Sequence, residues 1–202
     1  MKIDPRRALA LPVTYQALQS LIARPDTTSR LLNEILKLKP GEKVLDIGCG
    51  PCTLFQHMPP IDYIGMDMSA DYIASARAAY GDKGRFLVGA VSPDSSLEEL
   101  GKFDLIMALG LLHHVDDATA SSLFAAAKSA LKPGGRVVTL DNVFVLEQSL
   151  AARTIIKMDR GLHVRDREGY ARIAASHFNN VEVTILHDLL RIPYTHIIME
   201  CR

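Results

Sequence analysis

The chain has 202 residues, of which 48% are apolar and 23% are charged. This composition is typical of one globular domain and excludes a disordered chain. Basic and acidic residues number 23 each, so no overall positive field attracts nucleic acid or an anionic membrane. The chain has three cysteines, no apolar run near about 18 residues and no signal-peptide core. We therefore predict a soluble, cytoplasmic protein that binds neither nucleic acid nor membrane.

The expected elements begin with an N-terminal helical cap over residues 1–40, in which Thr28 or Ser29 caps a helix at 30–38. From residue 43, short apolar runs alternate with helical stretches, which indicates βαβ units and a mainly parallel sheet. Strands are predicted at 43–47, 63–66, 85–88, 103–108 and 136–140. Helices are predicted between them at 69–80, with Ser69 as the cap, and at 117–131.

The last third of the chain continues this pattern. The sequence Lys-Pro-Gly-Gly at 132–135 is expected to end the second helix and turn the chain into the strand at 136–140. A helical stretch at 145–159, a basic loop at 160–165 and a helix at 167–177 follow. Two β-rich runs at 181–186 and 192–200 are expected to pair as an antiparallel hairpin.

The most informative motif is Val-Leu-Asp-Ile-Gly-Cys-Gly-Pro-Cys at 44–52, in which an apolar strand leads into Gly-x-Gly and then into a predicted helix. The glycines permit backbone angles closed to other residues and let a ligand approach the main chain without meeting a Cβ atom. A helix N-terminus beyond the loop would add exposed N–H groups and a positive dipole end. Alone, a Gly-x-Gly motif is weak evidence.

Asp67 strengthens the interpretation of this loop as a cofactor-binding loop. It ends the second predicted strand, 21 residues after Asp46 and 19 after Gly48. A carboxylate at that place can accept hydrogen bonds from both ribose hydroxyls of an adenosyl group. The alternative is a charge that only stabilises the start of the helix after Ser69. The loop and the acid together indicate a cofactor that contains adenosine.

Later motifs distinguish between the adenosine cofactors. A dinucleotide fingerprint has a third glycine where this chain has Thr53. The chain carries Leu-Asp-Ile-Gly-Cys-Gly at 45–50, Phe-Asp-Leu-Ile at 103–106, Leu-Leu-His-His-Val-Asp at 111–116 and Leu-Lys-Pro-Gly-Gly at 131–135. With these motifs the sequence resembles the class I S-adenosylmethionine-dependent methyltransferases of the small-molecule type, most closely over residues 31–140.

The resemblance implies a fold. It is a doubly wound, Rossmann-like α/β sheet of seven strands in the order 3-2-1-4-5-7-6, with strand 7 antiparallel. A single methyltransferase domain would cover residues 1–202. Its cofactor-binding half would lie at 41–142, and its substrate-side helices and C-terminal β-hairpin at 143–202.

The resemblance also implies where S-adenosylmethionine binds. Its methionine end would lie over the glycine loop and its ribose on the acid after strand 2. Adenine would lie between apolar side chains, and the segment after strand 4 would line the floor near the sulfonium. The implied residues, in chain order, are Asp46, Gly48, Cys49, Gly50, Asp67, Met68, Ala90, Val91, Leu109 and Gly110. The family often has an acid after strand 3; here Asp94, a backbone carbonyl or stacking would hold adenine instead.

The cysteines of the loop allow another interpretation, because Cys49-Gly50-Pro51-Cys52 is also the dithiol motif of a thioredoxin. We favour the cofactor loop because Asp67 lies at ribose distance along the chain. No second close pair of ligands accompanies the cysteines, so no metal site is expected. A nicotinamide-dependent oxidoreductase and a non-catalytic S-adenosylmethionine-binding protein stay as alternatives.

Candidate residues for the methyl acceptor come later in the chain. His113 and His114 follow the fourth strand, where a neutral imidazole can remove a proton from an attacking hydroxyl or amine; a structural role is the alternative. Arg160 and Arg165 are candidates for binding an anionic group, unless the loop is only a solvated surface. The further substrate-binding candidates are Tyr194, Tyr15 and His196, the last of which a packed strand position would also explain.

We predict in-line transfer of the methyl group of S-adenosylmethionine to an oxygen or nitrogen of a small-molecule acceptor, with an anionic acceptor as one option. The sulfonium is already activated, so a dedicated base is optional. The Met-Ala-Leu-Gly sequence at 107–110 stands where nucleobase methyltransferases carry an Asn-Pro-Pro-Tyr-type motif, which disfavours a nucleic-acid substrate. The chain is expected to be a monomer or a homodimer.

Overall fold

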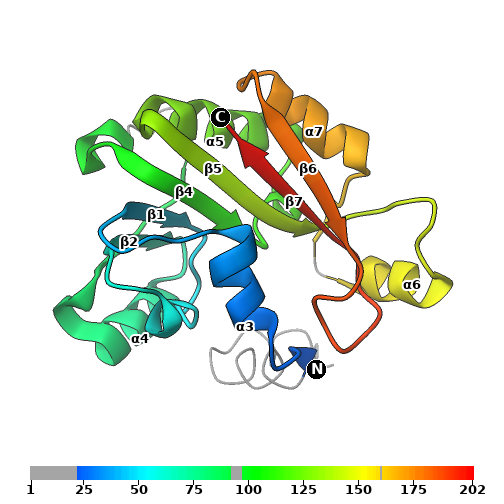
Figure 1. The fold of residues 1–202 in the computed structure, drawn as a ribbon, viewed down its shortest axis with the longest axis horizontal. Coiled ribbons are helices and arrows are strands. Elements are labelled where there is room, and N and C mark those ends of the chain that lie inside the picture. The colour runs from blue at the N-terminus through cyan, green and yellow to red at the C-terminus, as the bar shows by residue number, and fades with distance from the viewer. Residues whose placement is uncertain (1–21, 92–96, 160) are drawn as a thin grey trace, which may run out of the picture.

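The computed structural model describes residues 22–91, 97–159 and 161–202 of the chain. Its centre is a seven-stranded sheet in the order β3-β2-β1-β4-β5-β7-β6 (Figure 1). The strands are β1 Lys43–Ile47, β2 Asp62–Asp67, β3 Arg85–Val88, β4 Phe103–Leu109, β5 Leu131–Asn142, β6 Val181–Leu186 and β7 His196–Cys201. Strand β7 is antiparallel to both β5 and β6, whereas β1 to β5 pair in parallel. The predicted strand order is confirmed.

Helices cover both faces of this sheet. They are α3 Thr27–Ser29, which continues as a π-helix over Arg30–Ile35, then α4 Ala70–Tyr80, α5 Asp117–Ala130, α6 Leu150–Met158 and α7 Arg167–Ala175. Short 3-10 turns stand at Phe55–His57, Gly81–Lys83, Leu97–Leu100 and Leu112–His114. The side chain of Ser69 accepts a hydrogen bond from the Tyr72 N–H and so caps α4, as predicted. In the described part of the chain, no helix is long and apolar enough to cross a membrane.

The alternation of strand side chains produces two hydrophobic cores, one on each face. Leu45 of β1 points into the core that includes Phe124 of α5 and Ile173 of α7. Its neighbour Val44 points into the opposite core, with Ile73 of α4. Figure 1 shows the same layers, with α5 and α7 on one side of the sheet and α3 and α4 on the other. Central strands that are buried on both faces are continuous apolar runs, as in this sequence.

Two local predictions are wrong. The chain after the glycine loop does not begin a helix but forms turns and the 3-10 turn Phe55–His57. The backbone of Gly50 and of Cys52 has φ of 55° and 56°, which an α-helix does not allow. The N-cap of the first described helix is Asp26, without a side-chain bond. The predicted caps Thr28 and Ser29 therefore lie inside the helix, which already begins at Thr27. Thr27 donates its hydroxyl to the Leu189 carbonyl 2.7 Å away and so joins two distant segments.

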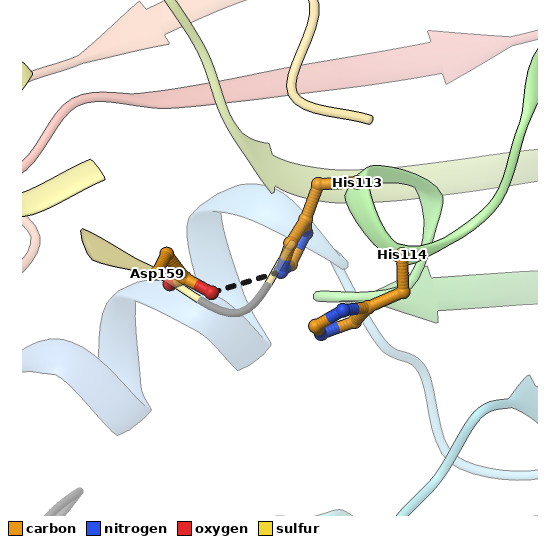
Figure 2. A group of neighbouring side chains, drawn as sticks. All are labelled: His113, His114 and Asp159. Carbon is orange, nitrogen blue, oxygen red and sulfur yellow. Dashed lines mark ion pairs between the residues drawn. The ribbon is translucent and has the colours of Figure 1, made fainter. Parts of the chain in front are cut away.

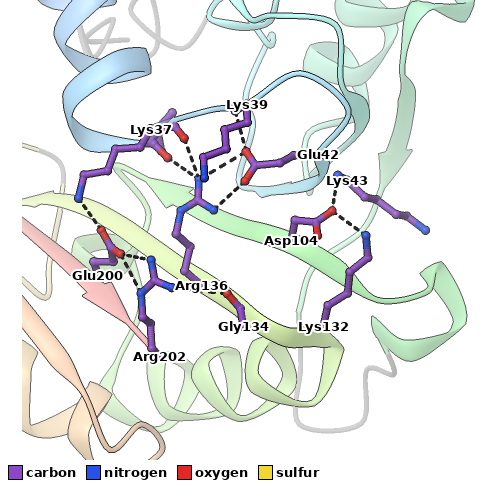
Figure 3. A network of polar contacts seen from close by, with 11 residues as sticks. Lys37, Lys39, Glu42, Lys43, Asp104, Lys132, Gly134, Arg136, Glu200 and Arg202 are labelled. Carbon is purple, nitrogen blue, oxygen red and sulfur yellow. Dashed lines mark hydrogen bonds and ion pairs between the residues drawn. The ribbon is translucent and has the colours of Figure 1, made fainter.

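A charged network stabilises the edge of the sheet at which the parallel strands begin (Figure 3). Arg136 of β5 is only 8% exposed. Its Nη1 donates to Glu42 Oε1 at 2.8 Å and its Nη2 to the Leu36 carbonyl at 2.7 Å. Asp104 accepts from Lys132 Nζ in the same region. Glu42, the Leu36 carbonyl and Asp104 thus bind cationic side chains of the chain itself, which gives this edge a structural role. Sheets of this kind bind ligands at the opposite, carboxyl edge.

Candidate cofactor and acceptor site

The glycine loop lies at the carboxyl end of β1. The N–H groups of Gly48 and Cys49 both donate to the Met66 carbonyl of β2, at 2.8 and 3.1 Å. A Cβ atom on Gly48 would lie 3.0 Å from Leu111 Cδ1, whereas one on Gly50 would have nothing within 4 Å. The loop is therefore packed on one side and open at Gly50, which fits a ligand that approaches the main chain.

Asp67 at the end of β2 holds this open part of the loop. Its Oδ2 accepts from the Gly50 N–H and its Oδ1 from the Ser69 N–H, both at 2.8 Å. A carboxylate has about four lone-pair sites, so each oxygen can accept one further hydrogen bond. Asp67 thus has both a structural role and the remaining capacity that two ribose hydroxyls require.

Asp46 lies beneath the loop and is only 6% exposed. Burial raises its pKa to about 7, an effect that the hydrogen bond from Tyr63 partly offsets and the neighbouring charge of Asp67 increases. The Tyr63 hydroxyl donates to Asp46 Oδ2 at 2.7 Å. Tyr63 was not among the predicted site residues; it lies on the neighbouring parallel strand, 17 residues after Asp46.

The two loop cysteines are free thiols. Both sulfur atoms lie against Gly65 of β2, where an added Cβ would be 3.0 Å from Cys49 Sγ and 3.1 Å from Cys52 Sγ. The hydrogen bond to Cys52, together with burial and the charge of Asp46, raises the pKa of Cys49 well above its usual range. A neutral thiol is neither a nucleophile nor a metal ligand, so this environment favours the cofactor loop over the dithiol interpretation.

The residues predicted around adenine lie beside the loop at the same edge of the sheet, because Asp67 pairs with Val88 across β2 and β3. The Met68 side chain is 77% exposed and Val91 is buried in the core, so Met68 can reach a ligand more readily than Val91. Ala90 is exposed between them. Asp94 lies outside the described residues.

The segment that was predicted to form the floor of the site directly follows β4. Leu109 ends β4, and the Gly110 N–H donates to the Leu140 carbonyl of β5 at 2.6 Å. Gly110 has φ of 73°, a backbone angle that favours glycine. Leu111, which contacts Gly48, leads directly into the turn Leu112–His114. The two predicted histidines therefore begin beside the glycine loop.

Figure 2 shows His113 and His114 with Asp159, which directly follows α6. The Nδ1 atom of His113 lies 2.8 Å from Oδ1 of Asp141, which also accepts the His113 backbone N–H at 3.1 Å. The other ring nitrogen, Nε2, lies 3.9 Å from Asp159 Oδ1. Asp141 at the end of β5 thus fixes the orientation of the His113 ring.

Asp159 is held in turn by residues from three segments. It accepts from the Tyr194 hydroxyl at 2.7 Å and from the Gly161 N–H at 3.1 Å. Burial opposes its charged form, but the Tyr194 hydrogen bond and the nearby His113 hold the pKa of Asp159 below its usual value. Asn142 donates to the Tyr194 hydroxyl at 2.8 Å. These contacts connect the carboxyl ends of β4 and β5 to the segment after α6.

Residues 44–135 match the family model described as a methyltransferase domain. The match covers 92 of the 202 residues. Over that segment, and with the strand order given above, the chain is similar to the class I methyltransferases. It is similar to a ubiquinone biosynthesis O-methyltransferase of Xanthomonas axonopodis pv. citri, with 33% identity over 50% of this chain and 44% of the relative. A phosphoethanolamine N-methyltransferase 3 of Arabidopsis thaliana is 30% identical over 72% of this chain and 30% of the relative.

Solved structures agree on the fold of this methyltransferase domain. A TehB-like SAM-dependent methyltransferase from Corynebacterium glutamicum superposes with a TM-score of 0.69 at 17% identity, covering 98% of this chain and 100% of the other. The chain spans about half the length, or less, of the curated relatives it matches.

The remaining predicted acceptor residues lie in different environments. Every guanidinium nitrogen of Arg165 donates within the domain: Nε to Asp117, Nη1 to the Leu112 and His163 carbonyls, and Nη2 to the Val115 carbonyl. Arg165 therefore fastens the histidine turn, a structural role that the sequence-based interpretation did not consider. Arg160 and Tyr15 lie outside the described residues.

Tyr194 and His196 differ although they are two residues apart. Tyr194 reaches Asp159 and also lines a pocket of about 230 Å³ with Glu147, Ser149 and His187. His196 is 6% exposed, and burial lowers its pKa to about 4. The ring centroids of the two residues are 4.9 Å apart. His196 is thus a packed strand residue beneath the site, whereas Tyr194 belongs to it.

Sequence reasoning did not select Asp141, Asn142 and Asp159 for the site. The first two directly follow the predicted strand at 136–140, and polar residues at that position of a parallel strand were a usable signal. Asp159 ends the predicted helical stretch at 145–159, and the sequence assigned it no role. Its approach to His113 depends on how α6 returns to the sheet, which no spacing in the sequence reveals.

Proposed function

We propose that this methyltransferase domain binds S-adenosylmethionine and transfers its methyl group to an oxygen or nitrogen of a small-molecule acceptor. The observation that carries the proposal is the open loop at Gly50, held by Asp67 with lone pairs to spare. When bound, S-adenosylmethionine supplies an electrophilic methyl group on a positively charged sulfur. Asp46, Gly48, Cys49 and Gly50 would hold its methionine end, Asp67 the ribose.

The other cofactor residues complete this assignment. Met68, Ala90 and Val91 would flank adenine, and Leu109 and Gly110 would face the sulfonium. Met68, with 77% exposure, has an apolar surface that a purine can cover. The relatives named above include both an O- and an N-methyltransferase, which supports an oxygen or nitrogen acceptor.

The acceptor would approach from the side of His113, His114 and Tyr194. The described groups there are imidazoles, a phenol and the carboxylate of Asp159, which suit a hydroxyl or amine donor. Proton removal by His113 or His114 stays a prediction. Recognition of an anionic acceptor now depends on Arg160, because the donors of Arg165 are used inside the domain.

The test has two steps. Isothermal calorimetry with S-adenosylmethionine, and with NAD and NADP as comparisons, should show binding of the first alone. Transfer of a tritiated methyl group into fractions of small metabolites should then identify the acceptor. Preferred binding of a nicotinamide nucleotide would overturn the proposal. Binding of S-adenosylmethionine without transfer to any fraction would favour the non-catalytic alternative.

A further inference from the structure

Three side chains with metal-binding atoms converge beside the proposed acceptor site (Figure 2). They are His113 and His114 from the turn after β4 and Asp159 from the end of α6. One ligand atom from each lies within 4.8 Å of the others. Two imidazoles and a carboxylate are a common ligand set for divalent transition metals.

The surroundings of His113 match those of a metal ligand. Its Nδ1–H donates to Oδ1 of Asp141, whose side chain is fully buried. This leaves the lone pair of Nε2 on the side of Asp159 Oδ1, 3.9 Å away. Metal-binding histidines nearly always donate their second ring N–H to a carboxylate or carbonyl, which fixes the tautomer and the ring orientation.

The separation of His113 and Asp159 is also informative. At 3.9 Å, Nε2 and Oδ1 are too far apart for a direct hydrogen bond. Two ligand atoms at bonds of about 2.1 Å lie roughly 3.4 Å apart in a tetrahedral site. Since the ligand atoms lie within 4.8 Å of one another, the cluster must contract by at most about 1.4 Å at its widest point. The exposed His114 and the half-buried Asp159 can make that movement while the buried His113 stays in place.

Two hydrogen bonds orient the half-buried Asp159 side chain. Tyr194 occupies Oδ2 from one side, and the Gly161 N–H takes one lone pair of Oδ1, so a second lone pair of Oδ1 is available to a ligand. Gly161 also allows the close approach, since a Cβ there would meet the His113 carbonyl oxygen at 2.9 Å and its ring more closely still.

We propose that His113, His114 and Asp159 form a binding site for one divalent transition-metal ion, such as Zn²⁺ or Co²⁺, with a coordination position left for the acceptor. Three protein ligands and an open position are the arrangement of catalytic rather than structural sites. Spacing in the sequence predicted no metal, because Asp159 is 45 residues from His114.

The role of the ion toward the acceptor rests on the proposed function, whereas its binding does not. A hydroxyl bound to a divalent ion loses its proton at a much lower pH than a free one. The proton passes to water, the oxygen forms a bond to the methyl carbon, and the carbon–sulfur bond breaks with its electron pair remaining on sulfur. The two imidazoles would then act through the ion rather than as free bases.

Metal binding can be measured without cofactor or acceptor. The full chain is stripped with a chelator and titrated with Co²⁺, with the visible absorption as the readout, and with Zn²⁺ by calorimetry. We expect one ion per chain, and His114→Ala and Asp159→Asn should each raise Kd at least about tenfold. His57→Ala, an exposed histidine outside the cluster, is the matched control and should leave Kd unchanged.

Three outcomes would overturn the site. They are no binding of either ion to the wild type, a Kd in both cluster variants equal to that of the wild type, or a rise in Kd for His57→Ala as large as in the cluster variants. Thermal unfolding of each variant is recorded alongside, to show whether the variant is folded. If His114→Ala does not fold, His114→Gln replaces it. Calorimetry with S-adenosylmethionine is the separate test of the proposed function. Methyl transfer that continues at full rate in chelated protein would refute the role of the ion in the reaction while leaving the proposed function intact.

Discussion

Replacement of Asp67 by alanine is the most direct test of the cofactor site. It removes the acceptor for two ribose hydroxyls and also the acceptor of the Gly50 and Ser69 N–H groups, each 2.8 Å away. Leaving one buried polar partner unpaired costs about 1–3 kcal/mol. Because about 1.4 kcal/mol corresponds to a factor of ten, we expect S-adenosylmethionine to bind at least tenfold more weakly, as measured by calorimetry.

The loss of the loop contacts must be separated from the loss of the ribose contacts. An S-adenosylhomocysteine analogue that lacks one ribose hydroxyl should bind the wild type more weakly than the parent compound does. With Asp67→Ala, the two compounds should bind almost equally, because the acceptor of that hydroxyl is already gone. A penalty for the missing hydroxyl that is the same in both proteins would refute a ribose contact, even if the variant bound weakly.

Two control variants complete the experiment. Asp62→Ala changes an exposed acid at the start of the same strand and should leave Kd unchanged. Asp67→Asn keeps one acceptor oxygen but loses the charge, so its Kd should fall between those of the wild type and Asp67→Ala. Equal affinity in the wild type and Asp67→Ala would refute the assignment outright.

Three further predictions concern stability and the acceptor side. Arg136→Met leaves Glu42 without its buried partner and should lower the free energy of unfolding by about 3 kcal/mol in urea titrations; an unchanged urea midpoint would contradict the structural role of this edge. His196 binds its proton less readily when folded, with a pKa of about 4 instead of 6.5, so stability should fall as the pH drops from about 6.5 to 4. His196→Phe should reduce that dependence in unfolding titrations at each pH. Arg165→Lys keeps the charge but not the fork of donors to the histidine turn. It should lower Tm by a few degrees, while Kd for S-adenosylmethionine stays within about twofold. An unchanged Tm is the result expected if Arg165 belongs only to a solvated loop.

The positions of the strands and of the glycine loop could be predicted from the sequence, because both depend on short-range patterns. The order of the strands followed instead from the resemblance to the class I methyltransferases. Apolar runs of β1 and β4 are buried on both faces and therefore have no polar alternation. Gly48 and Gly50 have φ of 73° and 55°. Such positive angles favour glycine, so the two glycines in the sequence already indicate this loop. Asp67 follows from the regular length of one βα unit.

Two predictions from short-range patterns were wrong where the local sequence was compatible with more than one backbone conformation. The Pro-Cys sequence after Gly50 was compatible with a helix start, but Cys52 adopts a left-handed conformation, and its buried side chain packs under β2 instead. Thr28 and Ser29 are residue types that cap helices, and yet they lie inside a helix that begins at Thr27. The Thr27 hydroxyl bonds to Leu189, 162 residues away. Local propensity is worth only a fraction of a kcal/mol per residue, so such tertiary contacts decide the outcome.

The sequence by itself determined the fold class and the glycine loop, and it predicted Asp67 as the acid for the ribose, since each of these depends on residues that are close in the chain. Only the tertiary structure decided the acceptor side. It placed Asp159 beside His113, showed Asp141 as the partner of the same imidazole, and removed Arg165 from the candidate binding residues. These contacts join segments that are 28 to 53 residues apart, and their distance in space depends on how α6 and the following loop pack on the sheet, which no local pattern encodes.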